Sequence, residues 1–166
     1  MVSGKMLGAL NEQINAELYS AYLYLSMSAY FEDAHLRGFA SWMRVQAREE
    51  LGHVMRLYDY VVERGKRVEL SAIERPPSNW SSPLAGFEGA YKHERKITAR
   101  INSLVDMAIK DNDHATNNML QWFVAEQVEE EASATEIVER LKLVGDDGRG
   151  LLMLDRHLAE REPEEE

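Results

Sequence analysis

Apolar residues recur every three to four positions along most of the chain, which is the spacing of one buried helix face. The pattern predicts four long helices, at about 3–33, 36–64, 83–108 and 113–145, and a short fifth helix at about 151–161. On the first of these the predicted buried stripe is Leu7, Leu10, Ile14, Glu17, Leu18, Ala21 and Leu25. Ser3 and Asp113 are candidate N-caps, and Gly65 is a candidate C-terminal cap. The fold class is therefore all-α.

The segments between these helices predict how the helices are arranged. Each long helix would span about 40–48 Å at 1.5 Å per residue. The first and last connections are only a few residues long, so each joins an antiparallel pair. The middle connection, about 66–82, contains Pro76-Pro77 and is long enough to run back along the bundle. We therefore expect a four-helix bundle with one long crossover and parallel second and third helices.

Polar residues interrupt the apolar face on all four long helices. They are Glu17, Glu50, His53, Glu94, Gln127 and Glu130. Adding 77 to positions 17, 50 and 53 gives 94, 127 and 130, so the two helical hairpins present equivalent polar positions. This repeat predicts two halves related by a pseudo-twofold axis.

The types of these residues suit a metal site. Residues three apart share a helix face, so Glu50 and His53 can bind one ion together. A Glu from each of two helices, with i, i+3 pairs from the other two, is the carboxylate-bridged di-metal arrangement, and such ligands suit Fe(II), Mn(II) or Zn(II). The alternative is a set of ion-paired or partly hydrated core residues. No Lys or Arg falls on the same faces of the four helices, which favours the metal.

Composition narrows the function further. The 166 residues are enough for one domain, taken as a bundle over about 3–145, the short helix and an acidic tail at 162–166. A formal net charge of −10 disfavours nucleic acid as a partner and is compatible with cations, or simply with solubility. The chain has no cysteine, no apolar run of membrane-spanning length and no secretory signal, so we expect a cytoplasmic protein without a membrane partner.

Several segments resemble the non-haem ferritins of bacteria and archaea, members of the ferritin-like di-iron superfamily. They match in order and spacing over nearly the whole chain: NEQINAELYSAYLYLSM, FASWMRVQAREELGH, PPSNWSSPLAGFEGAYKHE and LQWFVAEQVEEEA. The resemblance implies a homo-oligomeric cage, usually of 24 subunits. Such a cage oxidises Fe(II) with dioxygen and stores the product as a ferric mineral.

The resemblance also implies roles for individual residues at a ferroxidase site. The first iron would be held by Glu17, Glu50 and His53, and the second by Glu50, Glu94 and Glu130, with Gln127 as a hydrogen-bonding neighbour. A third, weaker iron site would use Glu49, Glu126 and Glu129 with Glu130 shared. A solvated acidic face is the alternative for those three residues.

Three further positions bear on this interpretation. The resemblance places Tyr24 next to the two irons, as a hydrogen-bond donor or electron donor; the alternative is a core tyrosine. Trp122 is expected to be a packing residue. Haem-binding relatives carry a methionine directly after the bridging Glu, where this chain has Leu51, so no haem is expected. Those relatives also have a Glu-x-x-His pair where this chain has Gln127 and Glu130.

The sequence leaves open several other functions, the packing of the short helix and the position of the pore. The same bundle could be a di-metal oxidase acting on an organic substrate or peroxide, or a metal-free interaction module. A rubrerythrin-like protein would need a cysteine-ligated iron domain, which this chain cannot form. The apolar face of the short helix predicts packing around a symmetry axis of the cage, with docking onto its own bundle as the alternative. The polar segment 111–118 could line a pore.

Overall fold

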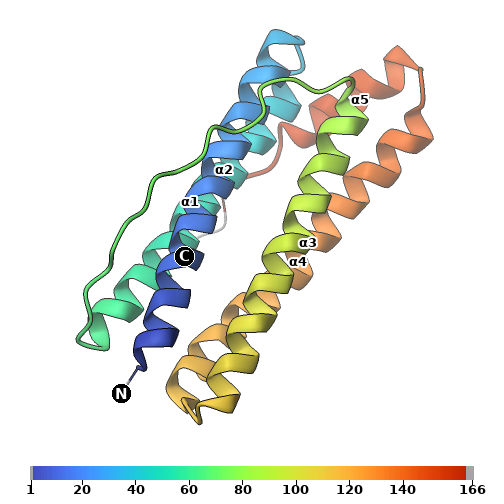
Figure 1. Ribbon diagram of the computed structural model, residues 1–166. Helices are drawn as coiled ribbons and strands as arrows, with labels where there is room; N and C mark the ends of the chain where they lie inside the picture. Colours follow the sequence, from blue (N-terminus) through green and yellow to red (C-terminus); the bar gives the residue numbers. More distant parts are fainter. Residues whose placement is uncertain (1, 164–166) are drawn as a thin grey trace.

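The computed structural model describes residues 2–163 and confirms an all-α bundle (Figure 1). The elements are α1 (Gly4–Asp33), α2 (Arg37–Glu63), α3 (Pro83–Lys110), α4 (His114–Val144) and α5 (Gly148–Leu158). Three of the long helices begin after a capping side chain. Ser3 accepts a hydrogen bond from Met6 N at 3.1 Å, and Ser82 and Asp113 make the equivalent contacts for α3 and α4. Residues 164–166 of the predicted acidic tail lie outside the described part of the chain.

The prediction for the last helix was wrong at both ends. α5 begins at Gly148, three residues earlier than expected, and ends at Leu158 rather than Arg161. The early start follows from Asp147, whose carboxylate accepts hydrogen bonds from Arg149 N at 3.1 Å and Gly150 N at 3.2 Å. A capping carboxylate satisfies exposed amide groups of the first turn, so two glycines do not prevent helix formation here.

The long connection between α2 and α3 runs back along the whole bundle beside α1 (Figure 1). Side chains of α1 bind its backbone in sequence order: Asn11 Oδ1 accepts from Glu69 N at 3.3 Å, and Asn15 donates to Ala72 O at 3.1 Å. Further along, Ser26 donates to Pro77 O at 2.5 Å. The connection is therefore parallel to α1, which makes α2 and α3 parallel and confirms the one-crossover topology.

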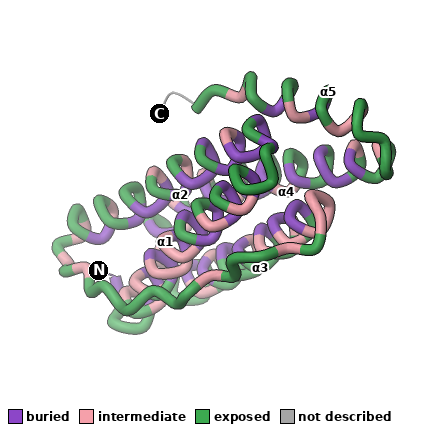
Figure 2. Tube along the Cα trace, turned by 90° about the horizontal axis from the view of Figure 1, so that it is seen from above, coloured by how far each residue is buried: buried purple, intermediate pink, exposed green. Residues whose placement is uncertain are grey.

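The bundle interior consists of two apolar clusters with a polar layer between them. One cluster contains Phe31, Phe39 and Phe87, and the other contains Leu10, Leu57 and Phe123. Between them lie six buried residues, which we call the polar layer: Glu17, Glu50, His53, Glu94, Gln127 and Glu130. Figure 2 shows the buried positions on the inward sides of the four long helices. The apolar clusters fix the helices above and below, so the polar layer lies on a rigid scaffold.

The predicted stripe on α1 was wrong at Leu25, whose residue surface is 48% exposed. Glu17 and Tyr24 are fully buried on the same helix. Successive residues advance by 100°, so the buried face centred on these two residues leaves Leu25 about a quarter of a turn away. Leu25 therefore belongs to the outer surface of the α1–α2 hairpin.

α5 docks onto its own bundle through its apolar side and its contact with α2. Leu154 and Leu158 are buried in the same cluster as Phe39, while Leu152 and Met153 are 58% and 73% exposed. Leu152 and Met153 are available for contact with other subunits, so packing of this helix around a symmetry axis of a cage stays a prediction. No helix in residues 2–163 combines the length and the apolar character needed to cross a membrane.

Candidate metal centre

The polar layer gathers side chains from all four long helices at mid-length of the bundle. Glu17 comes from α1, Glu50 and His53 from α2, Glu94 from α3, and Glu130 with Gln127 from α4. All six are buried, the most exposed being Glu130 at 7%. The structure thus brings together every residue for which the sequence predicted a role at the two-iron site.

Three of these residues form a candidate ligand set. The Nδ1 atom of His53 lies 3.2 Å from Glu50 Oε2 and 3.9 Å from Glu17 Oε2. Among the described residues, Glu17 Oε2 and His53 Nδ1 are the buried side-chain atoms without a hydrogen-bond partner. Buried polar atoms are rarely unpaired, because their desolvation then goes uncompensated. A divalent cation between these atoms would satisfy both, so the donor set fits a metal ion.

A second grouping lies beside the first. Single ligand atoms of His53, Glu126 and Glu130 all lie within 4.8 Å of one another, as do those of Glu17, Glu50 and His53. Glu94 and Glu130 are close enough to Glu50 that their charges raise its pKa, after the larger effect of burial. The carboxylates predicted to hold the second ion are therefore neighbours across α2, α3 and α4.

Burial and mutual repulsion set the electrostatics of the polar layer. Desolvation is the main cause that raises the pKa of Glu17, Glu50 and Glu94 above the usual range of a carboxyl group. For Glu130, desolvation and then the charge of Glu94 raise the pKa to about 8. Without a cation, Glu130 therefore favours its protonated form at neutral pH; metal ions would displace the proton and supply the missing positive charge.

Two buried glutamines bind these carboxylates, and sequence reasoning gave them no role. Gln13 donates to Glu17 Oε1 at 2.6 Å, and Gln46 donates to Glu130 Oε2 at 2.6 Å and to Glu50 Oε1 at 3.3 Å. Each precedes a carboxylate of its own helix by four residues, one helical turn. They are also 33 residues apart, the same spacing as Glu17 and Glu50, a signal that could have identified them.

Tyr24 and Gln127 both bind Glu94. The hydroxyl of Tyr24 donates to Glu94 Oε1, and the amide of Gln127 donates to Glu94 Oε2 at 3.1 Å. Burial and the surrounding carboxylates raise the pKa of Tyr24 well above that of a free tyrosine, so it stays a neutral donor. The predicted neighbour role of Gln127 agrees with this geometry, as does a hydrogen-bonding role for Tyr24.

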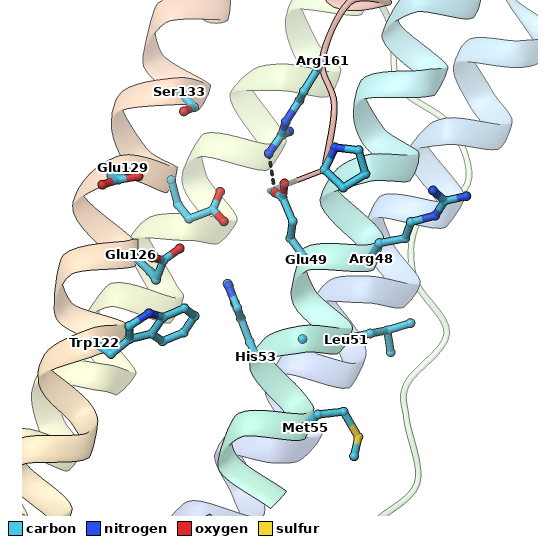
Figure 3. Close-up of a pocket in the computed structure, with 13 residues that line it drawn as sticks. Arg48, Glu49, Leu51, His53, Met55, Trp122, Glu126, Glu129, Ser133 and Arg161 are labelled. Atoms are coloured by element: carbon cyan, nitrogen blue, oxygen red, sulfur yellow. Dashed lines mark hydrogen bonds and ion pairs between the residues drawn. The ribbon is translucent and has the colours of Figure 1, made fainter. Parts of the chain in front are cut away.

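A cavity of about 470 Å³ opens next to the polar layer, between α2 and α4 (Figure 3). Its lining includes the three residues proposed for a third site: half-buried Glu49 and Glu126, and exposed Glu129. Trp122 forms part of the wall, with its ring 5.4 Å from that of His53, as expected of a packing residue. Arg161, from the segment after α5, reaches this cavity and binds Glu49; sequence reasoning missed it.

The position after the predicted bridging ligand carries no haem-ligating group. Leu51 is 46% exposed on α2, and Figure 3 shows its side chain pointing away from His53. Its side chain has no atom that could coordinate iron. The nearest methionine on the same side is Met55, one turn further on and 51% exposed.

Comparison with known proteins agrees with this geometry. The family model "Ferritin-like domain" matches residues 7–144. The chain is 44% identical over 161 residues to a bacterial non-heme ferritin of Bacteroides fragilis, covering 97% of this chain and 100% of that protein. It is 42% identical to one of Campylobacter jejuni, covering 95% of each.

A solved structure gives the same result for the fold. An open pore ferritin from the archaeon Archaeoglobus fulgidus superposes with a TM-score of 0.96 at 60% identity, covering 97% of this chain and 98% of that one. The family match over residues 7–144 extends from α1 to the end of α4. The chain therefore belongs to the ferritin family.

Proposed function

We propose that this protein is an iron-storage ferritin whose subunits oxidise Fe(II) at a di-iron ferroxidase centre. The observation that supports this most directly is the pair of unpartnered buried atoms, Glu17 Oε2 and His53 Nδ1, facing each other across Glu50. Such an arrangement costs free energy in the absence of a cation. Membership of the ferritin family supports iron as the cation.

Each ligand has a separate role in this proposal. Glu17 and His53 hold the first Fe(II), Glu94 and Glu130 hold the second, and Glu50 bridges them. Two Fe(II) ions each give one electron to dioxygen, so a pair supplies a two-electron reduction. Gln127 and Tyr24 keep Glu94 in place. The protein supplies ligand geometry and a site shielded by two apolar clusters.

We further propose that Glu49, Glu126 and Glu129, with Glu130 shared, form a third site for iron. They line the cavity beside the centre, and Glu126 already lies in a ligand grouping with Glu130. An ion leaving the centre would meet these carboxylates first. The product would then be stored as a ferric oxyhydroxide mineral.

Assembly into a homo-oligomeric cage of 24 subunits is part of the proposal, and the surface of α2 supports contact with other subunits. Leu51, Met55, Tyr58 and Val62 follow one another at helical spacing and are 37–52% exposed. An apolar stripe of this kind marks a contact with another protein chain.

Gel filtration should give roughly half a megadalton for 24 chains of 19.0 kDa each. A monomer or dimer would instead favour an oxidase of small molecules. The cytoplasm as its location is part of the same proposal.

The ferroxidase assignment is tested by a Glu50→Ala, His53→Ala double variant. Removing the bridge and a terminal ligand should slow Fe(II) oxidation by about a hundredfold or more, since loss of an outer-shell partner alone typically costs about 10- to 100-fold. Stopped-flow absorbance of the ferric product measures the rate. A control variant, Glu63→Ala with His157→Ala, removes an exposed residue of each type and should oxidise iron normally. Unchanged fast oxidation in the first variant would contradict the proposal.

A further inference from the structure

Arg161 lies three residues beyond the end of α5 and reaches back to the cavity beside the polar layer. Its guanidinium donates one hydrogen bond to Glu49 and a second, from Nη1 at 2.8 Å, to Gln46 Oε1. It also lies over the ring of Trp42, 4.2 Å from the ring centre. Its side chain is 22% exposed and that of Glu49 15%. Arg161 is thus held by three groups of α2 rather than by solvent.

Arg161 binds the carboxylate of Glu49, which is one of the ligands proposed for the third site. Figure 3 shows Arg161 pointing from the C-terminal segment onto Glu49, with Glu126 and Glu129 across the cavity on α4. Within residues 2–163, the ligand grouping at this side consists of His53, Glu126 and Glu130, while Glu49 binds the guanidinium. An oxygen that accepts a charge-assisted hydrogen bond from a guanidinium is a weaker ligand for a metal ion, because its negative charge is already partly neutralised.

The second contact connects Arg161 to the centre. A guanidinium has only donors, so Gln46 must present its carbonyl oxygen to Arg161 and its amide nitrogen to Glu130 and Glu50. Arg161 therefore fixes the orientation of the amide that binds two proposed iron ligands. Release of Arg161 from Glu49 would loosen that amide as well.

Charge explains why a metal ion can replace Arg161. The cavity edge carries the carboxyl groups of Glu49, Glu126, Glu129 and Glu130, and Arg161 brings one positive charge into direct contact with Glu49. A divalent ion supplies two and can bind several carboxylates at once. Arg161, however, is tethered to the same chain, so its local concentration stays high and it competes continuously for Glu49.

We infer that Arg161 is the resident cation of the third site: it occupies Glu49 until a metal ion displaces it, and it returns when that ion leaves. This inference rests on the proposed third iron site. It gives that site a built-in competitor, which weakens metal binding there and favours transfer of iron to the mineral over retention.

The test measures binding of Zn(II), which is not oxidised, to the assembled protein by calorimetry. In Arg161→Gln the third Zn(II) per subunit should bind about ten- to a hundredfold more tightly, since a charge-assisted contact no longer competes for Glu49. The first two ions should still bind before the third, so that the third step can be resolved; their affinity can change modestly, since Arg161 also orients Gln46. Arg161→Lys, which keeps the charge and loses the planar fork, should give an intermediate affinity.

Arg48→Gln is the matched control. Arg48 lies at the edge of the same cavity, but Figure 3 shows its side chain pointing away from Glu49. This variant removes the same charge and should leave the affinity for the third ion within about twofold, because an exposed charge directed away from the site is screened by solvent. An effect as large as that of Arg161→Gln would overturn the inference, since general charge would then explain both.

Tryptophan fluorescence gives a second measurement that does not depend on activity. In a Trp80→Phe, Trp122→Phe background, Trp42 is the single reporter and lies under the guanidinium. The third equivalent of Zn(II) should shift its emission, because the cation over the ring departs. The shift should be absent when Arg161→Gln is added.

The outcomes separate this inference from the proposed function. If the first two Zn(II) ions fail to bind, the di-metal centre itself is wrong. If they bind but no third step is seen in either protein, the proposed third site is wrong and the inference falls with it. If a third step is present and has the same affinity in Arg161→Gln, only the role of Arg161 is overturned. Arg161 would then be a structural contact that fixes the C-terminal segment.

Discussion

At the scale of single residues, equivalent positions of the two hairpins have different environments. Glu94 has hydrogen-bond donors on both carboxylate oxygens, from Tyr24 and Gln127. Glu17, its counterpart 77 residues earlier, is bound by Gln13 on one oxygen, and its other oxygen faces His53. The pseudo-twofold repeat therefore gives one carboxylate that is held in place and one that is open to a metal ion.

Tyr24→Phe tests whether the hydrogen bond from Tyr24 to Glu94 stabilises the fold. The substitution keeps the ring and removes one buried donor to Glu94, so we expect the free energy of unfolding of the metal-free protein to fall by about 1–3 kcal/mol. Chemical denaturation measures the change. Tyr58→Phe, at a position 37% exposed, should change stability by less than about 0.5 kcal/mol. Equal effects from both substitutions would mean that the contact adds no stability.

At the scale of helices, the contact between α2 and α5 depends on one glycine. A Cβ atom on Gly38 would lie 1.6 Å from the backbone oxygen of Asp155. The same approach lets Asp155 Oδ1 accept a hydrogen bond from Phe39 N at 3.0 Å, in the first turn of α2. The cap of α2, whose N-cap Leu36 offers no side-chain hydrogen bond, therefore comes from α5. This docking also directs the C-terminal segment, with Arg161, along α2.

Gly38→Ala should displace α5. The added methyl group meets backbone rather than a movable side chain, so we expect a loss of at least about 2 kcal/mol of stability and faster amide exchange throughout α5. Hydrogen exchange with mass spectrometry measures the local effect. Gly8→Ala is the control, because nothing lies within 4 Å of a Cβ there. It should stabilise α1 by about 0.5–1 kcal/mol. Unchanged exchange in α5 of the first variant would refute the docking argument.

At the scale of the whole molecule, the buried carboxylates link stability to pH. The pKa of Glu130 is raised to about 8 in the folded protein, while an unfolded chain has the usual value near 4.5. Between these values the folded protein keeps a proton that the unfolded chain has lost. Stability of the metal-free protein should therefore fall as pH rises from about 5 to 8. Metal binding removes this dependence by replacing the protons.

Chemical denaturation at a series of pH values checks this expectation. The metal-free protein should unfold at lower denaturant concentration at pH 8 than at pH 5.5, and saturation with Zn(II) at pH 8 should restore its resistance. Glu130→Gln, which cannot ionise, should reduce the pH dependence. Glu139→Gln, an exposed position, should leave it unchanged. A metal-free protein that becomes more stable toward pH 8 would show that the carboxylates are ionised in the fold.

The sequence by itself determined the helices, their pairing and the polar layer. These features depend on local periodicity, on a connection of 17 or so residues and on the 77-residue repeat, all of which can be counted along the chain. The resemblance added iron as the ion. Gln13 and Gln46 could also have been predicted from the sequence, because each lies one helical turn before a carboxylate of the polar layer.

The tertiary structure alone decided which groups meet across large separations. Arg161 binds Glu49 across 112 residues and Asp155 caps α2 across 116, and neither contact follows any period. The outward position of Leu25 likewise depends on how α1 is rotated against its neighbours. Such contacts arise from the packing of whole helices, in which the position of each side chain is set by all the others. Local pattern therefore identified the residues of the polar layer, whereas packing brought Arg161 onto Glu49.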